Sequence, residues 1–179
     1  MLRRLFTGAL LGAVIFTPCL LQSAAKKNGP ADLNLLDLDN RKVHLKDLRG
    51  KVVVVNFWAT WCGPCNEEMP MLVETEKEWG PKGVTFIGAS LDDRSTQKKI
   101  PDFMNRYQPG FAIWKGATPD DLQKLGLGQG VPDTVFVDEE GTIFARVLGQ
   151  IKKEELLERL EWATGDRTKP APAALLKNM

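Results

Sequence analysis

The stretch Trp58-Ala59-Thr60-Trp61-Cys62-Gly63-Pro64-Cys65 decides the fold of this chain. It follows a run of apolar β-forming residues and precedes a segment of helical character. Because Pro64 suits a first helical position, Cys62 is expected where free N–H groups and the positive end of the helix dipole favour a thiolate. Cys65 falls three residues later on the same helix face, close enough to form a disulfide. One activated, exposed thiol with a second behind it predicts thiol–disulfide exchange.

Two other interpretations of the cysteine pair compete with redox exchange. A zinc half-site also uses C-x-x-C spacing, but it needs two further ligands, and the chain offers only Cys19 and His44 besides the pair. A purely structural disulfide would close a loop so short that it constrains the unfolded chain little. The pair is therefore interpreted as redox-active, and the site is expected to need no metal and no cofactor.

The residues around the pair carry a family resemblance. The segment at 57–65, FWATWCGPC, resembles the active-site segment of the thioredoxin superfamily. The flanking segments LKDLRGKV at 45–52 and NEEMP at 66–70 resemble the TlpA/ResA/CcmG-like branch of exported thiol–disulfide reductases. The resemblance covers about residues 31–164. It implies an α/β thioredoxin fold, with a mixed central β-sheet, helices on both faces and an N-terminal β-hairpin extension.

The segment Gly130-Val131-Pro132 opens a predicted strand. Proline cannot donate to a β-ladder and so belongs at the start of a strand, and a loop proline is usually trans. In the thioredoxin superfamily, however, this proline is cis and lies against the cysteines, and the backbone of the preceding residue pairs with the substrate. The resemblance thus implies a substrate-binding surface made of Trp61, Gly63, Pro64, Val131 and Pro132. Asp133 stands where relatives commonly have threonine.

Glu68 follows Cys65 by three residues, and helical spacing places both on an apolar stripe from which Glu67 turns away. Burial there disfavours a charged carboxylate unless it has a partner. In TlpA/ResA-like proteins this position is a buried glutamate beside the thiols, which implies that Glu68 exchanges a proton with Cys65. Thioredoxin instead carries an aspartate six residues before its first cysteine, where this chain has Asn56. The alternative interpretation of Glu68 is a solvated helix residue.

The chain divides into three predicted segments. Residues 1–25 have two arginines, an apolar run and small residues at their end, which predicts an export signal. Left uncleaved, that run is barely long enough for an N-terminal membrane anchor, and Cys19 within it is a poor candidate for lipidation. Residues 26–165 form one thioredoxin-like domain, and the Pro/Ala-rich residues 166–179 are predicted to be a disordered tail.

Strands and helices alternate along the predicted domain, which favours a mixed sheet covered by helices. Strands are predicted at 33–38, 42–45, 52–57, 84–91, 111–114, 134–137 and 142–148. Helices are predicted at 66–79, 95–107, 118–125 and 152–164. A formal net charge of +1 gives no indication of nucleic-acid binding.

The leading functional hypothesis is an exported reductase of client-protein disulfides that acts in the periplasm or another extracytoplasmic space. Retention of the N-terminal segment as a membrane anchor is the alternative to its cleavage. Cys62 attacks the client, and Cys65 resolves the mixed disulfide. The resemblance implies clients such as apocytochrome c or copper-site cysteines, and a membrane thiol reductant of the CcdA/DsbD type. We expect a monomer. The alternatives are a peroxiredoxin-like thiol peroxidase and a copper-binding chaperone, although the chain has no histidine after His44 to complete a copper site.

Overall fold

The strand order of the central sheet explains where the cysteine pair lies. The computed structural model describes residues 29–176, so the predicted export segment at 1–25 lies outside the described part of the chain. The described residues form a sheet with the order β2-β1-β5-β4-β3-β6-β7-β8. None of the helices within residues 29–176 is long and apolar enough to cross a membrane.

The elements follow the predicted order along the chain. The strands are β1 (Asn34–Asp37), β2 (Lys42–His44), β3 (Val52–Trp58), β4 (Val84–Ser90), β5 (Ala112–Lys115), β6 (Asp133–Val137), β7 (Ile143–Leu148) and β8 (Leu175–Leu176). The helices are α1 (Gly63–Trp79), α2 (Ile100–Tyr107), α3 (Pro119–Lys124) and α4 (Lys153–Thr164). Short 3-10 turns lie at Leu45–Leu48, Gly80–Lys82 and Gln97–Lys99.

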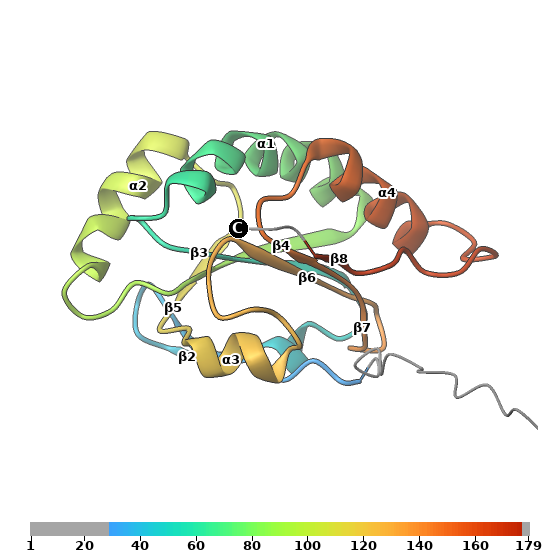
Figure 1. Ribbon diagram of the computed structural model, residues 1–179, viewed down its shortest axis with the longest axis horizontal. Helices are drawn as coiled ribbons and strands as arrows, with labels where there is room; N and C mark the ends of the chain where they lie inside the picture. The colour runs from blue at the N-terminus through green and yellow to red at the C-terminus, as the bar shows by residue number, and fades with distance from the viewer. Residues whose placement is uncertain (1–28, 177–179) are drawn as a thin grey trace, which may run out of the picture.

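The central strand β3 is buried along its whole length, because helices cover both faces of the sheet. Figure 1 shows α1, α2 and α4 on one face and α3 on the other. Val54 and Trp58 pack into the core beneath α1, whereas Val53 and Val55 pack into the core on the α3 side. A strand covered on both faces needs apolar residues at every position, which accounts for its continuous apolar run. The predicted α/β fold with helices on both faces is confirmed.

The sheet is mixed, as predicted. Strand β3 pairs in parallel with β4 and antiparallel with β6, and β4 pairs in parallel with β5. The predicted N-terminal hairpin is the antiparallel pair β1–β2, and a second hairpin joins β6 to β7. Because β3 and β4 run in parallel, their carboxyl ends meet at one edge of the sheet. The chain turns from β3 into α1 at that edge.

Helix α1 begins at Gly63, three residues before the predicted start of the helix. Cys62 is its N-cap residue, and the helical pattern of apolar residues becomes recognisable only after the Gly-Pro dipeptide. Thr118 caps α3: its hydroxyl oxygen accepts the N–H of Asp121, and the two residues form a capping box.

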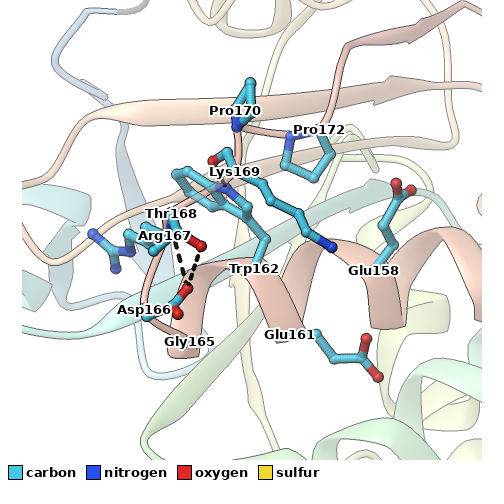
Figure 2. Close-up of a pocket in the computed structure, with 10 residues that line it drawn as sticks. All are labelled: Glu158, Glu161, Trp162, Gly165, Asp166, Arg167, Thr168, Lys169, Pro170 and Pro172. Carbon is cyan, nitrogen blue, oxygen red and sulfur yellow. Dashed lines mark hydrogen bonds between the residues drawn. The ribbon is translucent and has the colours of Figure 1, made fainter.

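The prediction of a disordered tail is wrong for residues 166–176. This segment turns back over the end of α4 (Figure 2) and adds β8 in parallel to β7. The buried Arg159 donates from Nη2 to the carbonyl oxygen of Ala173 at 2.7 Å, and Trp162 donates from Nε1 to the carbonyl oxygen of Lys169 at 2.8 Å. Arg167 forms an ion pair with Glu139 in the β6–β7 turn. These contacts come from distant parts of the chain, so the composition of the segment does not reveal them.

Deletion of residues 166–179 should lower the free energy of unfolding by about 2–4 kcal/mol, because the buried Arg159 loses a carbonyl acceptor and β7 loses β8, one of its two neighbouring strands. Trp162→Phe keeps an aromatic ring but removes the hydrogen bond to Lys169 and one ring of the packed indole, so it should cost about 1–3 kcal/mol. Urea unfolding followed by circular dichroism measures both values. A truncated protein as stable as the full chain would show that the tail contributes no stability.

Candidate active site

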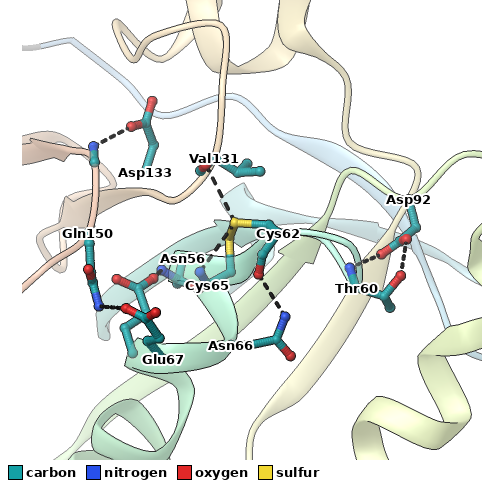
Figure 3. The surroundings of a disulfide bond; sticks show 12 residues. Asn56, Thr60, Cys62, Cys65, Asn66, Glu67, Asp92, Val131, Asp133 and Gln150 are labelled. Carbon is teal, nitrogen blue, oxygen red and sulfur yellow. Dashed lines mark hydrogen bonds between the residues drawn. A yellow bond between two sulfur atoms is a disulfide. The ribbon is translucent and has the colours of Figure 1, made fainter. Parts of the chain in front are cut away.

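The Cys62–Cys65 disulfide lies at the N-terminus of α1, directly after β3 (Figure 3). Cys62 is the N-cap residue with an extended backbone, and its Sγ accepts a hydrogen bond from the N–H of Cys65 at 3.2 Å. Pro64 occupies the first turn, where a missing N–H removes no intrahelical bond. Once the disulfide is reduced, the free N–H groups and the positive end of the helix dipole stabilise a thiolate at Cys62.

The surroundings of the pair combine buried sulfurs with an exposed rim. Cys65 is 0% exposed, and Cys62 is only 5% exposed, less than its motif predicts. The cause is the neighbouring loop, since the carbonyl oxygen of Val131 lies 3.5 Å from Cys62 Sγ. Trp61, by contrast, is 59% exposed, and Gly63 and Pro64 are exposed beside it. A molecule that approaches the disulfide therefore meets this rim first.

The peptide bond between Val131 and Pro132 is cis, as the resemblance implies, and Pro132 immediately precedes β6. The carbonyl of Val131 faces the pair in Figure 3. In the disulfide form Cys62 Sγ carries no hydrogen, so the 3.5 Å approach is a contact, whereas the reduced thiol can donate to this carbonyl.

Glu68 points into the protein, and Glu67 points outward, as helical spacing predicts. Glu68 is 2% exposed, and its Oε1 accepts a hydrogen bond from Asn56 Nδ2 at 2.7 Å. Its Oε2 accepts the N–H of Ile151 at 2.9 Å, so the carboxyl group joins α1 to the segment after β7. Glu67 is exposed and receives only a long contact from Gln150, at 3.5 Å. A buried carboxylate requires such donors, because without them its desolvation would be costly.

Asn56 connects this carboxylate to the opposite strand. Its Nδ2 donates both to Glu68 and to Thr134 Oγ1, the latter at 3.1 Å, while its Oδ1 accepts no hydrogen bond from the described residues. Asn56 lies on β3, which places it beneath the start of α1. Sequence analysis noted this residue only as the replacement of an aspartate and did not predict that it orients Glu68.

Sequence analysis also missed Asp92, which holds the turn before the cysteines. Asp92 is 1% exposed, and its carboxylate accepts the N–H of Thr60 at 2.9 Å and the hydroxyl of Thr60 at 2.6 Å. The hydroxyl of Ser90 donates to the same carboxylate at 2.8 Å. A signal was present, because Asp92 follows the strand parallel to β3 and the carboxyl ends of parallel strands meet at one edge.

A second unpredicted chain of hydrogen bonds joins α2 to the backbone of Cys62. The hydroxyl of Tyr107 donates to Asn66 Oδ1 at 3.0 Å, and Asn66 Nδ2 donates to the carbonyl oxygen of Cys62 at 2.7 Å. Tyr107 is the one tyrosine in the sequence. Asn66 lies next to Cys65 in the first turn of α1, so these bonds fix the capping residue from the helix side.

A groove of about 730 Å³ opens beside the disulfide. Its walls are the first turns of α1, the Val131–Pro132 loop and the segment between β7 and α4. The apolar residues Met71, Val131 and Ile151 line it together with Glu68. Glu67, Lys152, Lys153 and Glu154 give its rim charges of both signs.

His44 lies far from the cysteines in the strand order, on the edge strand β2, where its Nδ1 contacts Asn34 Oδ1. His44 is therefore a half-buried strand residue remote from the disulfide. Within residues 29–176, no three His, Cys, Asp or Glu side chains gather closely enough to hold a metal ion.

Two cysteines that close a disulfide across the first turn of a helix, with the helix dipole directed at one of them, are arranged to exchange that disulfide with other thiols. This fold and site define a thiol–disulfide oxidoreductase. The chain belongs to the AhpC/TSA family, whose family model matches residues 27–146.

Relatives and solved structures agree with this class. The chain is 35% identical over 120 residues to the thiol-disulfide oxidoreductase ResA of Bacillus thuringiensis strain Al Hakam, covering 67% of this chain and 68% of the relative. A thiol:disulfide interchange protein of the thioredoxin family from Chlorobium tepidum matches with a TM-score of 0.64 and 26% identity, covering 79% of this chain and 100% of that one. A secreted disulfide oxidoreductase of Mycobacterium tuberculosis, described as homologous to DsbE of E. coli, matches with a TM-score of 0.58 and 25% identity over 72% and 93% of the two chains. The predicted thioredoxin fold and TlpA/ResA/CcmG-like branch are confirmed.

Proposed function

We propose that the protein is an exported reductase of disulfide bonds in client proteins and works through a Cys62/Cys65 dithiol–disulfide cycle. The observation that carries this proposal is the asymmetry of the pair. Cys62 caps α1 and its Sγ accepts the N–H of Cys65, whereas Cys65 itself is 0% exposed. The thiol that is stabilised as a thiolate and lies nearer the surface meets the client first. The Gly63-Pro64 dipeptide between the cysteines resembles that of reducing members of the superfamily.

The cycle moves two electrons from the protein to the client. The Cys62 thiolate attacks one client sulfur, the client S–S bond breaks, and the leaving client thiolate takes a proton from water. Cys65 then loses its proton and attacks Cys62 Sγ, which releases the second client thiolate and closes the Cys62–Cys65 disulfide. A membrane thiol reductant of the CcdA/DsbD type would return two electrons and restore the dithiol.

The groove and the backbone of Val131 beside Cys62 support the binding of a protein client. An extended client chain can pair with the backbone of Val131, whose carbonyl oxygen already lies 3.5 Å from Cys62 Sγ. The exposed ring of Trp61 offers apolar contact area beside the reacting sulfur. Trp61, Gly63, Pro64, Val131 and Pro132 thereby form the proposed client-binding surface.

Glu68 is proposed as the proton carrier for Cys65. Cys65 lies too deep for bulk water to take its proton directly, whereas the carboxyl group of Glu68 lies one helical turn further along α1 and also borders the groove. Glu68 would accept the proton as Cys65 attacks the mixed disulfide and return it when the pair is reduced. Asn56 and the N–H of Ile151 hold the carboxyl group in place for this transfer.

Export and client identity rest on the N-terminal segment and on the relatives. Residues 1–25 have the composition of an export signal, and the matched disulfide oxidoreductase of Mycobacterium tuberculosis is described as secreted. We propose an extracytoplasmic monomer whose clients are apocytochrome c or copper-site cysteines. The peroxidase and copper-chaperone alternatives remain as outcomes of peroxide-consumption and metal-binding assays.

Single-cysteine variants test the proposed function. Cys65→Ser keeps the attacking thiol and removes the resolving one, so with insulin as a model disulfide it should accumulate a covalent mixed disulfide. Cys62→Ser should form at least about tenfold less adduct, because Cys65 is buried. Both variants should lose at least about 10³-fold in insulin reduction, measured by turbidity, while mass spectrometry locates the adduct.

The same experiment can refute the assignment. Equal adduct formation by Cys62→Ser and Cys65→Ser would show that Cys62 is not the selective nucleophile. A wild-type protein that consumes hydrogen peroxide as fast as it reduces insulin would favour the thiol peroxidase instead.

Glu68→Gln tests proton transfer with a side chain of the same shape. Its NH₂ group must turn toward Asn56 Nδ2 or the Ile151 N–H, so the pH dependence of the step is the readout specific to proton transfer. The variant should slow resolution of the mixed disulfide by about 10–100-fold and flatten the pH dependence of that step, since the amide cannot accept the proton. Glu67→Gln is the matched control on the outward face and should alter neither property. Stopped-flow tryptophan fluorescence over a pH series measures the step. If both variants behave alike, the proton travels through water without Glu68.

A further inference from the structure

Asp133 is a buried carboxylate that the proposed cycle does not use. It is the first residue of β6, directly after the cis-proline, and its side chain is 0% exposed. Its Oδ2 accepts the N–H of Gly128 at 2.8 Å, and its Oδ1 accepts the N–H of Gly149 at 2.8 Å. Figure 3 shows the second of these bonds as a dashed line from Asp133 to the backbone just before Gln150.

The two donors belong to the two loops that form one side of the groove. Gly128 lies in the loop between α3 and β6, which carries Val131 to Cys62. Gly149 begins the segment between β7 and α4, and two residues later the N–H of Ile151 reaches Glu68. The N–H of Gly149 also donates to the carbonyl oxygen of Pro132 at 2.9 Å. One carboxylate therefore holds both loops to the start of β6.

Burial of Asp133 disfavours the ionised form of its carboxyl group. Burial raises the pKa of Asp133, and the N–H groups of Gly149 and Gly128 lower it without cancelling the effect of burial. A group whose pKa is higher in the folded state stabilises the fold below its unfolded pKa. That contribution is lost as the pH rises through the folded value. Ionisation of Asp133 therefore lowers the stability of the fold, and a carboxyl group with a perturbed pKa beside a reactive site is a candidate for function.

We propose that Asp133 is a positioning residue for client binding, which holds the 125–131 loop and the Gly149–Ile151 segment in fixed register on either side of the cis-proline. Through the first loop it fixes the carbonyl of Val131 against Cys62, and through the second it fixes the N–H of Ile151 against Glu68. The role rests on the proposed function, because it concerns a client that occupies the groove.

The chemistry of a carboxylate suits this role because it is an acceptor only, with two oxygens that can serve two separate donors. An asparagine at this position would turn its NH₂ group toward one of the two N–H donors, and one loop would lose its anchor. A substitution at Gly128 disturbs the same hydrogen bond from the donor side. A Cβ added there would lie 3.2 Å from Asp133 Oδ2, so Gly128→Ala should displace the carboxylate slightly without removing its charge.

Asp138 provides a matched control in the same hairpin. It follows β6 at the end away from the cis-proline, and its Oδ1 accepts the N–H of Thr142 at 2.7 Å within the β6–β7 turn. Burial raises the pKa of Asp138, as it does for Asp133. Asp138→Asn therefore removes a partly buried charge from the same hairpin but touches neither loop of the groove.

The test compares a protein disulfide with a small aromatic disulfide for the full chain and for Asp133→Asn, Gly128→Ala and Asp138→Asn. For Asp133→Asn we expect kcat/KM toward insulin to fall about tenfold, mainly through KM, and the rate with dithionitrobenzoate to fall less than about threefold. Gly128→Ala should show the same selectivity, with a loss of about threefold toward insulin. Asp138→Asn should remain within about twofold of wild type in both assays.

Equal proportional losses toward both disulfides, or no loss toward insulin, would overturn the role of Asp133. The role would also be overturned if Asp138→Asn lost activity toward insulin but not toward the small disulfide, as Asp133→Asn is expected to do. Any disturbance of the β6–β7 hairpin would then be enough to weaken client binding. If Asp133→Asn does not fold, Gly128→Ala decides the question in the same way. A wild-type protein that does not reduce insulin refutes the proposed function itself, which separates the two failures.

Discussion

The hydrogen bond from the Cys65 N–H to Cys62 Sγ at the N-cap of α1 is the interaction on which the site depends. A sulfur in this position replaces the oxygen that usually caps a helix, so folding the helix also prepares the thiolate. The surrounding protein keeps that geometry fixed. Strand β3 delivers the turn, Asp92 holds Thr60 just before it, and Asn66 holds the carbonyl oxygen of Cys62 just after it. The sheet, with a hydrophobic core on each face, therefore holds Cys62 at the N-terminus of α1.

Two buried carboxylates organise the other side of the disulfide. Glu68 on α1 accepts the N–H of Ile151, and Asp133 on β6 accepts the N–H of Gly149. The short segment between β7 and α4 is therefore hydrogen-bonded to both elements. Buried carboxylates are costly, and each of these is satisfied by N–H donors. Their roles in the proposed cycle differ. Glu68 borders the groove and lies near Cys65 along α1, where it can carry a proton, whereas Asp133 lies behind the cis-proline, where it can only set positions.

The sequence predicts the parts of the structure that local physics determines. Helical spacing alone separates the buried Glu68 from the exposed Glu67, and the apolar run of β3 predicts a strand covered on both faces. The cis bond before Pro132 follows from resemblance and not from local sequence, which favours trans. Asp92, Tyr107 and the tail were missed because their partners lie far away along the chain. The tail is ordered by Arg159 and β7, and no periodicity within residues 166–176 records those contacts. The near burial of Cys62 likewise depends on Val131, 69 residues further along the chain.

The difference in reactivity between the two thiols is measured most directly by alkylating the reduced protein. A limiting amount of iodoacetamide at slightly acidic pH, followed by peptide mapping, reports the rate at each cysteine separately. Capping of α1 by Cys62 and the burial of Cys65 predict that Cys62 is modified at least about tenfold faster, with the difference growing as the pH falls. Modification of Cys65 at an equal or greater rate would contradict the assignment of Cys62 as the thiol that the helix activates.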